Sequence, residues 1–435
     1  MTSLDSQTMR TLQDGLTSAQ AGFAARFPGE SSARQPVHVV YGGAHLFKAE
    51  TAQKLGALAR QALTTYAPDA LSFAEALDLS DELAARVYPR VVAKLEREPV
   101  EDFRIDFEDG YGHRPDEEED GHALEAARQV ARGFAEDLLP AFLGIRIKPM
   151  SAELGARAIR TLDLFLTELK RPILITLPKV VSVAQVKLFV GVLDELERKL
   201  SFPARSLRVE FMVESAQGLI DAEGRHLLPQ LHAAADGRLQ AAHFGTYDYT
   251  ASVDVTAALQ GMRHPACEFA KSLMKLAFAG TGVFLSDGAT TQLPIGPHKW
   301  ASLTEAQREE NRRVVHGAWL ASVDDIRHSL GGGFYQGWDL HPAQLVARYG
   351  TVFAFFLESL APATERLSNF VKHLGQATTV GDSFDDAATG QGLLNYFLRG
   401  LACGALTGEE VAATGLTPEE LTSRSFALIA RNRRA

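Results

Sequence analysis

Two carboxylates close short apolar runs, where a protein interior rarely holds charge unless it is paired or bound to a metal. Glu214 ends the run Leu207–Glu214, and Asp248 ends the next such run, Ala241–Asp248. Carboxylate oxygens with no His or Cys nearby suit a hard cation, so this pair is predicted to bind Mg²⁺, with Mn²⁺ as a substitute. The alternative is that Glu214 caps the following helix or pairs with a lysine.

A single arginine, Arg146, interrupts the apolar segment Gly144–Ile147. A planar guanidinium can hold a carboxylate through two parallel hydrogen bonds, so Arg146 is predicted to bind the carboxylate of a small acid. The alternative is an internal salt bridge to Asp106 or Glu108, and both interpretations can hold together.

Acidic residues also close the run Phe103–Asp109. Side chains alternate along a strand, so Asp106 and Glu108 share one face. Such a pair can orient Arg146, hold metal-bound water or act as a base. With Asp109, these residues form the predicted catalytic group. The alternative is a solvated strand end.

Two further residues are predicted to contact the substrate. Lys179 follows Pro178 at the end of an apolar run, and His341 precedes Pro342, which is expected to open a helix. For His341 the alternative is a structural role at the edge of the site.

These residues require elements that bring them to one edge. Short β-branched runs alternate with amphipathic helical stretches, which indicates a parallel sheet. The predicted strands are Val37–Leu46, Phe103–Asp109, Leu143–Lys148, Ile173–Val180, Leu207–Glu214, Ala241–Asp248, Gly282–Asp287 and Phe334–His341. Eight strands favour an α/β fold of the (β/α)₈ TIM-barrel class over an open doubly wound sheet, and a barrel carries its active site at the carboxyl ends of its strands.

The same pattern divides the chain into three parts. Residues 1–36 are predicted to form an N-terminal helical extension, and residues 37–373 the barrel, with a helical insertion over about 69–99 after the first strand. Residues 374–435 are predicted to form a C-terminal helical appendage, which begins with a linker rich in Gly, Thr and Asp. Its apolar helix Leu393–Leu406 is predicted to pack over a barrel mouth, of its own or a neighbouring subunit, or alternatively against the outer helices.

Composition excludes several classes of function. The 435 residues include 44 Lys and Arg and 54 Asp and Glu, a formal net charge of −10, which argues against a nucleic-acid or anionic-membrane partner. No apolar stretch is long enough to span a membrane, and the polar start lacks a signal core, so a cytoplasmic protein is expected. Two cysteines cannot form a disulfide framework.

Seven motifs, in order along the chain, resemble those of the HpcH/HpaI aldolase superfamily, in its citrate lyase β-subunit and malyl-CoA lyase branch. They are Asp106–Asp109, Ala127-Arg128, Arg146–Lys148, Leu177–Val180, Val213–Ala216, Phe244–Tyr249 and Gly337–Gln344. The segment around Asp248 is also similar to malate synthase. The sequence departs from the superfamily pattern at Lys148, where an asparagine is usual, and at Trp338, where a basic residue is usual.

The resemblance implies a TIM barrel that binds Mg²⁺ through Glu214 and Asp248 and holds the substrate carboxylate with Arg146. It implies a carbon–carbon lyase or aldolase acting on a small oxo- or hydroxy-acid, or on its CoA thioester, in a homo-oligomer that is a trimer or hexamer. Two alternatives stay open: a malate synthase-like or thioester-hydrolysing enzyme on the same scaffold, and a non-catalytic ligand-binding regulatory protein.

Overall fold

The computed structural model describes residues 3–29, 31, 33–299, 302–372, 378–380, 383–385, 387–423 and 425–434. In that part of the chain, every helix is too short or too polar to cross a lipid bilayer.

Eight parallel strands form a closed barrel, in which each strand pairs with the next and β8 pairs with β1. The strands are β1 (His38–Gly43), β2 (Asp102–Asp106), β3 (Phe142–Arg146), β4 (Leu174–Leu177), β5 (Val209–Val213), β6 (Leu239–Phe244), β7 (Phe284–Ala289) and β8 (Gln336–Trp338). The prediction of a TIM barrel is therefore confirmed, and the open doubly wound sheet is excluded.

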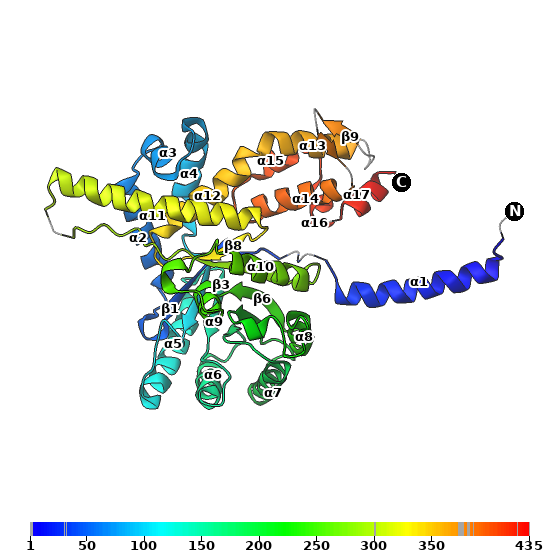
Figure 1. The fold of residues 1–435 in the computed structure, drawn as a ribbon, viewed down its shortest axis with the longest axis horizontal. Helices are drawn as coiled ribbons and strands as arrows, with labels where there is room; N and C mark the ends of the chain where they lie inside the picture. The colour runs from blue at the N-terminus through cyan, green and yellow to red at the C-terminus, as the bar shows by residue number, and fades with distance from the viewer. Residues whose placement is uncertain are drawn as a thin grey trace.

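Helices cover the outside of the barrel (Figure 1). They are α2 (Thr51–Tyr66), α5 (Asp116–Glu136), α6 (Gly155–Leu169), α7 (Val183–Leu200), α8 (Leu228–Ala234), α10 (Pro265–Phe278), α11 (Glu305–Gly331) and α12 (Gln344–Glu358), with the short α9 (Thr246–Ser252) after β6. Three 3₁₀ turns accompany them: η1 (Ala44–Leu46), η2 (Ala216–Gly218) and η3 (Ala257–Leu259). Apolar side chains on the outer faces of the strands, such as Ile105 and Ile145, are fully buried beneath this layer.

The segment between β1 and β2 carries two more helices, α3 (Ala70–Leu77) and α4 (Asp81–Arg97). Asp69 begins α3 with a capping box to Ser72, and Ser80 caps α4. Helix α3 packs against α11, and α4 packs against α12. The added helices therefore thicken one side of the barrel, outside α11 and α12.

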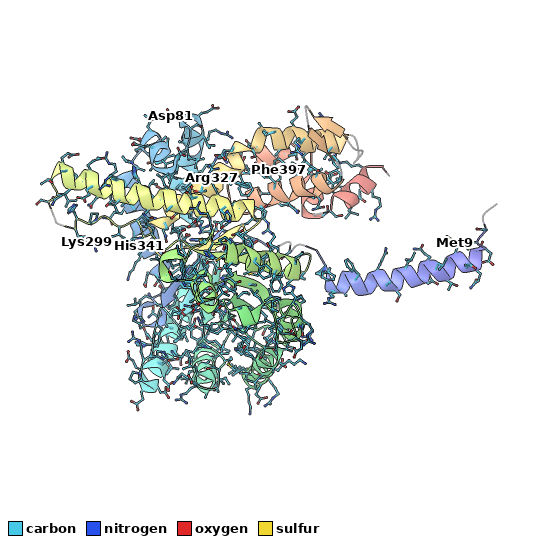
Figure 2. The ribbon with its side chains drawn as sticks, viewed as in Figure 1. Met9, Asp81, Lys299, Arg327, His341 and Phe397 are labelled. Carbon is cyan, nitrogen blue, oxygen red and sulfur yellow. The ribbon has the colours of Figure 1, made fainter. Side chains whose placement is uncertain are left out.

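Beyond α12 the chain forms α13 (Leu360–Lys372), a two-stranded sheet of β9 (Thr378–Val380) and β10 (Ser383–Asp385), α14 (Ala387–Ala402), α15 (Gly408–Ala412), α16 (Pro418–Ser423) and α17 (Phe426–Arg434). The short sheet stands where a linker was predicted; His373 lies outside the described residues. Figure 2 shows Phe397 within this group of helices, away from His341.

Helix α14 does not cover the mouth of its own barrel. Phe397 is fully buried, the Tyr396 hydroxyl donates to the carbonyl of Phe356 on α12, and Arg399 reaches Gln35, just before β1. Packing against α12 and α13 buries the apolar surface of α14 at the end where the strands begin. Within one chain, the prediction of a lid is thus wrong, and the alternative of outer-helix packing is correct.

Helix α1 (Ser6–Arg26) extends away from the barrel (Figure 1). Asp5 caps it by accepting a hydrogen bond of 2.7 Å from the amide of Thr8. No residue of α1 is buried in the described chain, and its apolar residues, exemplified by Met9 in Figure 2, face solvent.

Candidate functional site

Charged side chains from neighbouring strands meet at the carboxyl end of the barrel, as the topology requires. Glu108 follows β2, Arg146 ends β3, Lys179 follows β4 and Glu214 follows β5. Asp248 joins them from α9.

The ammonium of Lys179 lies among three carboxylates. Its Nζ is 2.6 Å from Asp248 Oδ2, 3.5 Å from Glu214 Oε2 and 3.7 Å from Glu108 Oε1. We call Glu108, Lys179, Glu214 and Asp248 the mouth cluster. Glu214 and Glu108 are buried, whereas the side chains of Lys179 and Asp248 are 33% and 46% exposed, so a small molecule can approach from the side of these two.

Backbone geometry fixes the mouth cluster. Lys179 has a φ of 52°, in the left-handed region, and its amide donates a 2.7 Å hydrogen bond to Glu214 Oε1. Gly245 follows β6, and a Cβ at that position would lie 2.6 Å from the Cβ of Glu214. A side chain at residue 245 would therefore displace Glu214.

Arg146 is almost fully buried and is held by Asp106. Its Nε and Nη2 donate to the two oxygens of Asp106 at 2.7 and 2.6 Å. The amides of Glu108 and Gly110 donate to the same carboxylate at 2.9 and 2.7 Å. Asp106 is thus engaged in positioning Arg146 and the β2 loop, which is the internal salt bridge considered as an alternative from the sequence.

The other edge of the Arg146 guanidinium faces the mouth cluster. Its Nη1 lies 2.9 Å from Glu108 Oε2 and 3.4 Å from Asp109 Oδ2. Tyr41 and Trp338 flank its charge, with ring centroids 4.8 and 5.7 Å from the guanidinium carbon. Trp338, noted above as a departure from the superfamily pattern, therefore contacts the Arg146 guanidinium and helps to hold it in place.

Burial and mutual repulsion change the acidity of the cluster. Burial, together with the charges of Glu214 and Asp109, raises the pKa of Glu108 to about 8. Burial, together with the charge of Asp248, raises the pKa of Glu214 to about 7. Burial alone would lower the pKa of Lys179, but the surrounding carboxylates raise it above its ordinary value. The cluster therefore contains more acidic groups than the single charge of Lys179 can neutralise, while Lys179 itself stays protonated.

Two predicted site residues, Asp109 and His341, lie outside the mouth cluster. The Asp109 side chain is 60% exposed and touches the cluster only through Arg146. His341 is half-buried; its Nδ1 accepts a 3.2 Å hydrogen bond from the amide of Ala343, and burial lowers its pKa. Among the described residues, the hydrogen bonds of His341 are made within its own loop, to Ala343 and Gln344, which agrees with the structural alternative.

Asp248 differs from its predicted placement. Strand β6 ends at Phe244, and Asp248 lies in the first turn of α9 instead of at a strand end. The aromatic and β-branched residues Thr246, Tyr247 and Tyr249 resemble a strand in sequence, but Gly245 is the N-cap of α9, so these residues form a helix.

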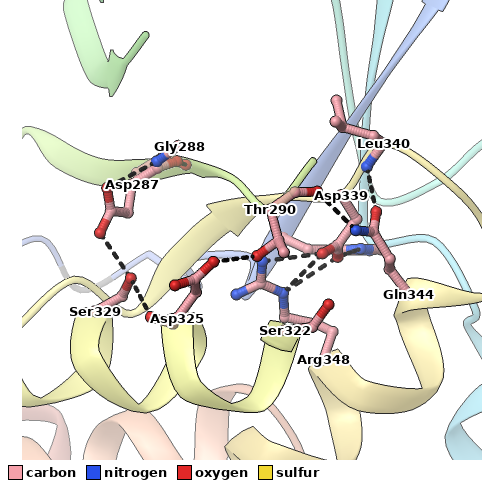
Figure 3. A network of polar contacts seen from close by, with 12 residues as sticks. Asp287, Gly288, Thr290, Ser322, Asp325, Ser329, Asp339, Leu340, Gln344 and Arg348 are labelled. Atoms are coloured by element: carbon pink, nitrogen blue, oxygen red, sulfur yellow. Dashed lines mark hydrogen bonds and ion pairs between the residues drawn. The ribbon is translucent and has the colours of Figure 1, made fainter. Parts of the chain in front are cut away.

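Asp287 in β7 and Asp339, just after β8, belong to a separate polar network behind these two strands (Figure 3). Asp287 accepts a 2.6 Å hydrogen bond from Ser329 on α11 and pairs with Lys271. Asp339 pairs with Arg348 on α12 at 2.9 Å. These carboxylates connect strands to outer helices and take no part in the mouth cluster.

Lys148 also turns away from the mouth. Its ammonium bonds to Glu119 on α5 at 2.6 Å and to the carbonyl of Phe107 at 2.8 Å. Lys148, which stands where the superfamily usually has asparagine, therefore links the end of β3 to α5 through an ion pair.

One layer nearer the start of the strands lies a buried network that the sequence analysis missed. Arg104 donates to Glu210 at 3.2 and 2.6 Å and also pairs with Asp102. His243 lies 2.9 Å from the same Glu210, whose pKa falls below its ordinary value because Arg104 and His243 outweigh its burial. The sequence contains a pattern that predicts such a network. Asp102, Arg104 and Asp106 are alternate residues of β2, so their side chains share the inner face. The remaining members are Tyr41, Thr176 and Gln336.

The donor set of the mouth fits a hard divalent cation. In the described residues, no three acidic, histidine or cysteine side chains are already arranged as a closed metal site. Mg²⁺, however, commonly takes one or two carboxylates and completes its shell with water and substrate oxygens. Glu214 and Asp248 supply two such groups, and the raised pKa of Glu214 marks a carboxylate that gains from an added positive charge.

Comparison with known proteins supplies a family and a fold. The family described as "Domain of unknown function (DUF6986)" matches residues 16–429. A citrate lyase from Burkholderia xenovorans LB400 aligns over 89% of this chain and 100% of its own, with a TM-score of 0.54 and 19% identity. A Haloferax volcanii malate synthase covers 92% of this chain and 99% of its own, with a TM-score of 0.45 and 12% identity. A search of curated proteins gives no match. The first of these structures confirms, at the level of fold, the resemblance drawn from the motifs.

Proposed function

The chain belongs to the DUF6986 family, and we propose that it is a divalent-metal-dependent enzyme that makes or breaks a carbon–carbon bond next to a carbonyl. Its substrate would be a small oxo- or hydroxy-acid or the CoA thioester of one. The observation that carries the proposal is the mouth cluster: three carboxylates around one ammonium, beside a buried arginine, at the end of the barrel where substrates bind.

Glu214 and Asp248 would hold the cation. When bound, a divalent metal supplies Lewis-acid stabilisation of negative charge that develops on a substrate oxygen. Lys179, whose raised pKa keeps it protonated, would then place a second positive charge at the same edge. Such fixed charges favour an enolate over the neutral keto form, because they need no reorganisation when the charge appears.

Arg146 would fix the substrate carboxylate through the edge that Asp106 leaves free. Asp106 and the two flanking rings hold the guanidinium rigid, so little side-chain entropy is lost on binding. Glu108, which faces this edge at 2.9 Å, has a pKa of about 8 and therefore carries a proton at neutral pH. In that form it leaves the charge of Arg146 to the substrate and can return a proton to the enolate carbon.

Exchange of the methyl protons of pyruvate for deuterium, followed by NMR in D₂O with Mg²⁺, tests the proposal. Exchange reports formation of an enolate without knowledge of the second product. We expect exchange with the wild-type protein and none with Glu214→Gln, which also loses Mg²⁺ binding in calorimetry.

The matched control is Asp116→Asn, which removes an exposed charge on α5 and should leave both exchange and Mg²⁺ affinity unchanged. Unchanged Mg²⁺ affinity in both Glu214→Gln and Asp248→Asn would contradict the metal assignment. Absence of exchange with pyruvate, oxaloacetate and an acyl-CoA thioester alike would contradict the enolate chemistry.

A further inference from the structure

A cavity opens at the end of the barrel opposite the mouth cluster, where the strands begin. It has a volume of about 970 Å³, within the range of small-molecule sites. Residues that precede or begin β5, β6 and β7 line it, together with α8 and the end of α1. Those used below are Arg26, Arg208, His232, Leu239, Leu276 and Phe284.

The wall contributed by the N-terminal segment is anchored to the barrel. The amide of Gly29 donates a 2.8 Å hydrogen bond to the carbonyl of Gly280, in the turn between α10 and β7. Gly280 and Gly282 have φ values of +71° and +80°, which other residues adopt only with strain. This turn therefore holds Phe27 and the adjoining Arg26 against the rim of the cavity.

Two guanidinium groups line the cavity without an acidic partner. Arg208 makes no side-chain hydrogen bond or ion pair with any residue that the structure describes, and burial and the charge of Arg238 lower its pKa. Neighbouring Arg238, by contrast, pairs with Glu197 at 2.6 Å. Arg26 stacks on Phe27 and pairs with no described acid.

The acidic side chain of the cavity is already engaged. Asp236 pairs with Arg205 at 2.8 Å, so the charge of Arg205 offsets it. The cavity as a whole is therefore positively charged within a protein whose net charge is −10. Leaving a half-buried guanidinium unpaired costs free energy, which an anionic ligand would recover.

Apolar side chains cover the remaining wall. Leu239 and Phe284 are buried, and Leu276 on α10 is 75% exposed at the rim. His232, whose pKa burial lowers, adds a neutral imidazole that can donate one hydrogen bond. The cavity thus combines two guanidinium groups, which can donate paired hydrogen bonds to phosphate oxygens, with an apolar surface.

We propose that this cavity binds an organic phosphate, with the phosphate on Arg208 and Arg26 and an apolar or aromatic body against Leu239, Leu276 and Phe284. The site lies at the opposite end of the barrel from the mouth cluster, so it does not depend on the function proposed above.

Calorimetry with ADP, inorganic phosphate and adenosine tests this assignment. We expect ADP to bind more tightly than either fragment, with an affinity that falls as salt increases. Arg208→Gln should weaken ADP binding about 10- to 100-fold, the usual loss of a charge-assisted contact. Arg26→Gln should weaken it as well and, on an exposed helix, cannot act through misfolding.

Arg198→Gln is the matched control, since it removes the same charge from an exposed ion pair with Glu195 on α7, outside the cavity. It should leave the affinity unchanged, as should Lys179→Gln at the mouth. Equal ADP affinity in wild type and Arg208→Gln, no ADP binding at millimolar concentration, or loss of binding only in Lys179→Gln would each overturn the proposal. Adenosine or inorganic phosphate binding as tightly as ADP would overturn the recognition of an organic phosphate.

Discussion

Two clusters of charge occupy the inside of this barrel in successive layers. In the inner network, Arg104 meets Asp102 and Glu210, and His243, Thr176 and Tyr41 supply the remaining contacts to Glu210. In the mouth cluster, one ammonium faces three carboxylates. In the inner network Arg104 and His243 lower the pKa of Glu210, although burial raises that of Asp102, whereas in the mouth cluster the pKa values of Glu108 and Glu214 are both raised.

This difference separates charge that holds a fold from charge that awaits a ligand. Buried charges that satisfy one another are stable as they stand, and removing one partner is costly. Carboxylates with raised pKa values at an accessible edge are typical of functional sites, because an incoming cation or proton can relieve them. Tyr41 connects the two layers: its hydroxyl contacts Glu210, and its ring contacts Arg146.

The largest effect should follow from breaking the inner network. Arg104→Met leaves Glu210 and Asp102 buried without their cation, so the free energy of unfolding should fall by about 3–5 kcal/mol in urea titration. The double variant Arg104→Met with Glu210→Gln should recover part of the loss. A single variant as stable as wild type would show that the inner network is not a structural ion cluster.

A smaller effect, measured on binding, should follow at the mouth. Arg146→Lys keeps the charge but not the planar fork, so binding of a 2-oxo-acid should weaken by about 1.5–3 kcal/mol, or 10- to 100-fold. Arg128→Lys, on the exposed face of α5, is the control in the same calorimetric titration. Equal affinity in Arg146→Lys and wild type would show that Arg146 serves only as the ion-pair partner of Asp106 and does not bind the substrate.

The mouth should also show a pH dependence of opposite sign to that of an ordinary ion pair. In metal-free protein, folded Glu108 has a pKa of about 8, against 4.5 when unfolded. Between these values the folded state keeps a proton that the unfolded state releases, so the free energy of unfolding should fall as pH rises through this window. Urea titrations with EDTA should show a shallower slope in Glu108→Gln and the wild-type slope in Glu117→Gln.

The smallest effect is expected at the exposed edge of the mouth. Asp109 lies 3.4 Å from Arg146, but its side chain is 60% exposed, so solvent screens the pair. Asp109→Asn should change the free energy of unfolding by less than about 0.5 kcal/mol. A loss of several kcal/mol in thermal or urea unfolding would place Asp109 with Asp106 among the groups that position Arg146.

The sequence predicted the barrel because eight apolar runs alternate with amphipathic helical stretches, which favours a closed barrel over an open sheet. It also placed Glu108, Arg146, Lys179 and Glu214 at one edge, since parallel strands must end together. Asp248 was misplaced because its aromatic neighbours favour a strand locally, whereas in the structure the chain leaves β6 at Phe244 and begins α9 at Thr246.

Other features depended on partners distant in sequence. Asp287 and Asp339 follow apolar runs as Glu214 does, and only the positions of Ser329 and Arg348 on outer helices show that these carboxylates turn outward (Figure 3). Helix α14 is apolar enough to be a lid or a packed outer helix. Which of the two it forms depends on the surface of α12 against which it packs. The sequence of α14 alone does not predict that contact.

Helix α1 has a consequence for how the protein melts. Because none of its residues is buried among those described, its stability comes from its own hydrogen bonds and its Asp5 cap, as in an isolated peptide. Away from its last turn, where Arg26 adjoins the Gly29–Gly280 hydrogen bond, its helix–coil equilibrium is therefore uncoupled from the cooperative unfolding of the barrel. Circular dichroism should lose part of its helical signal gradually at low temperature, before the single sharp transition of the barrel core in which Trp319 is buried, so one melting temperature cannot describe the whole chain.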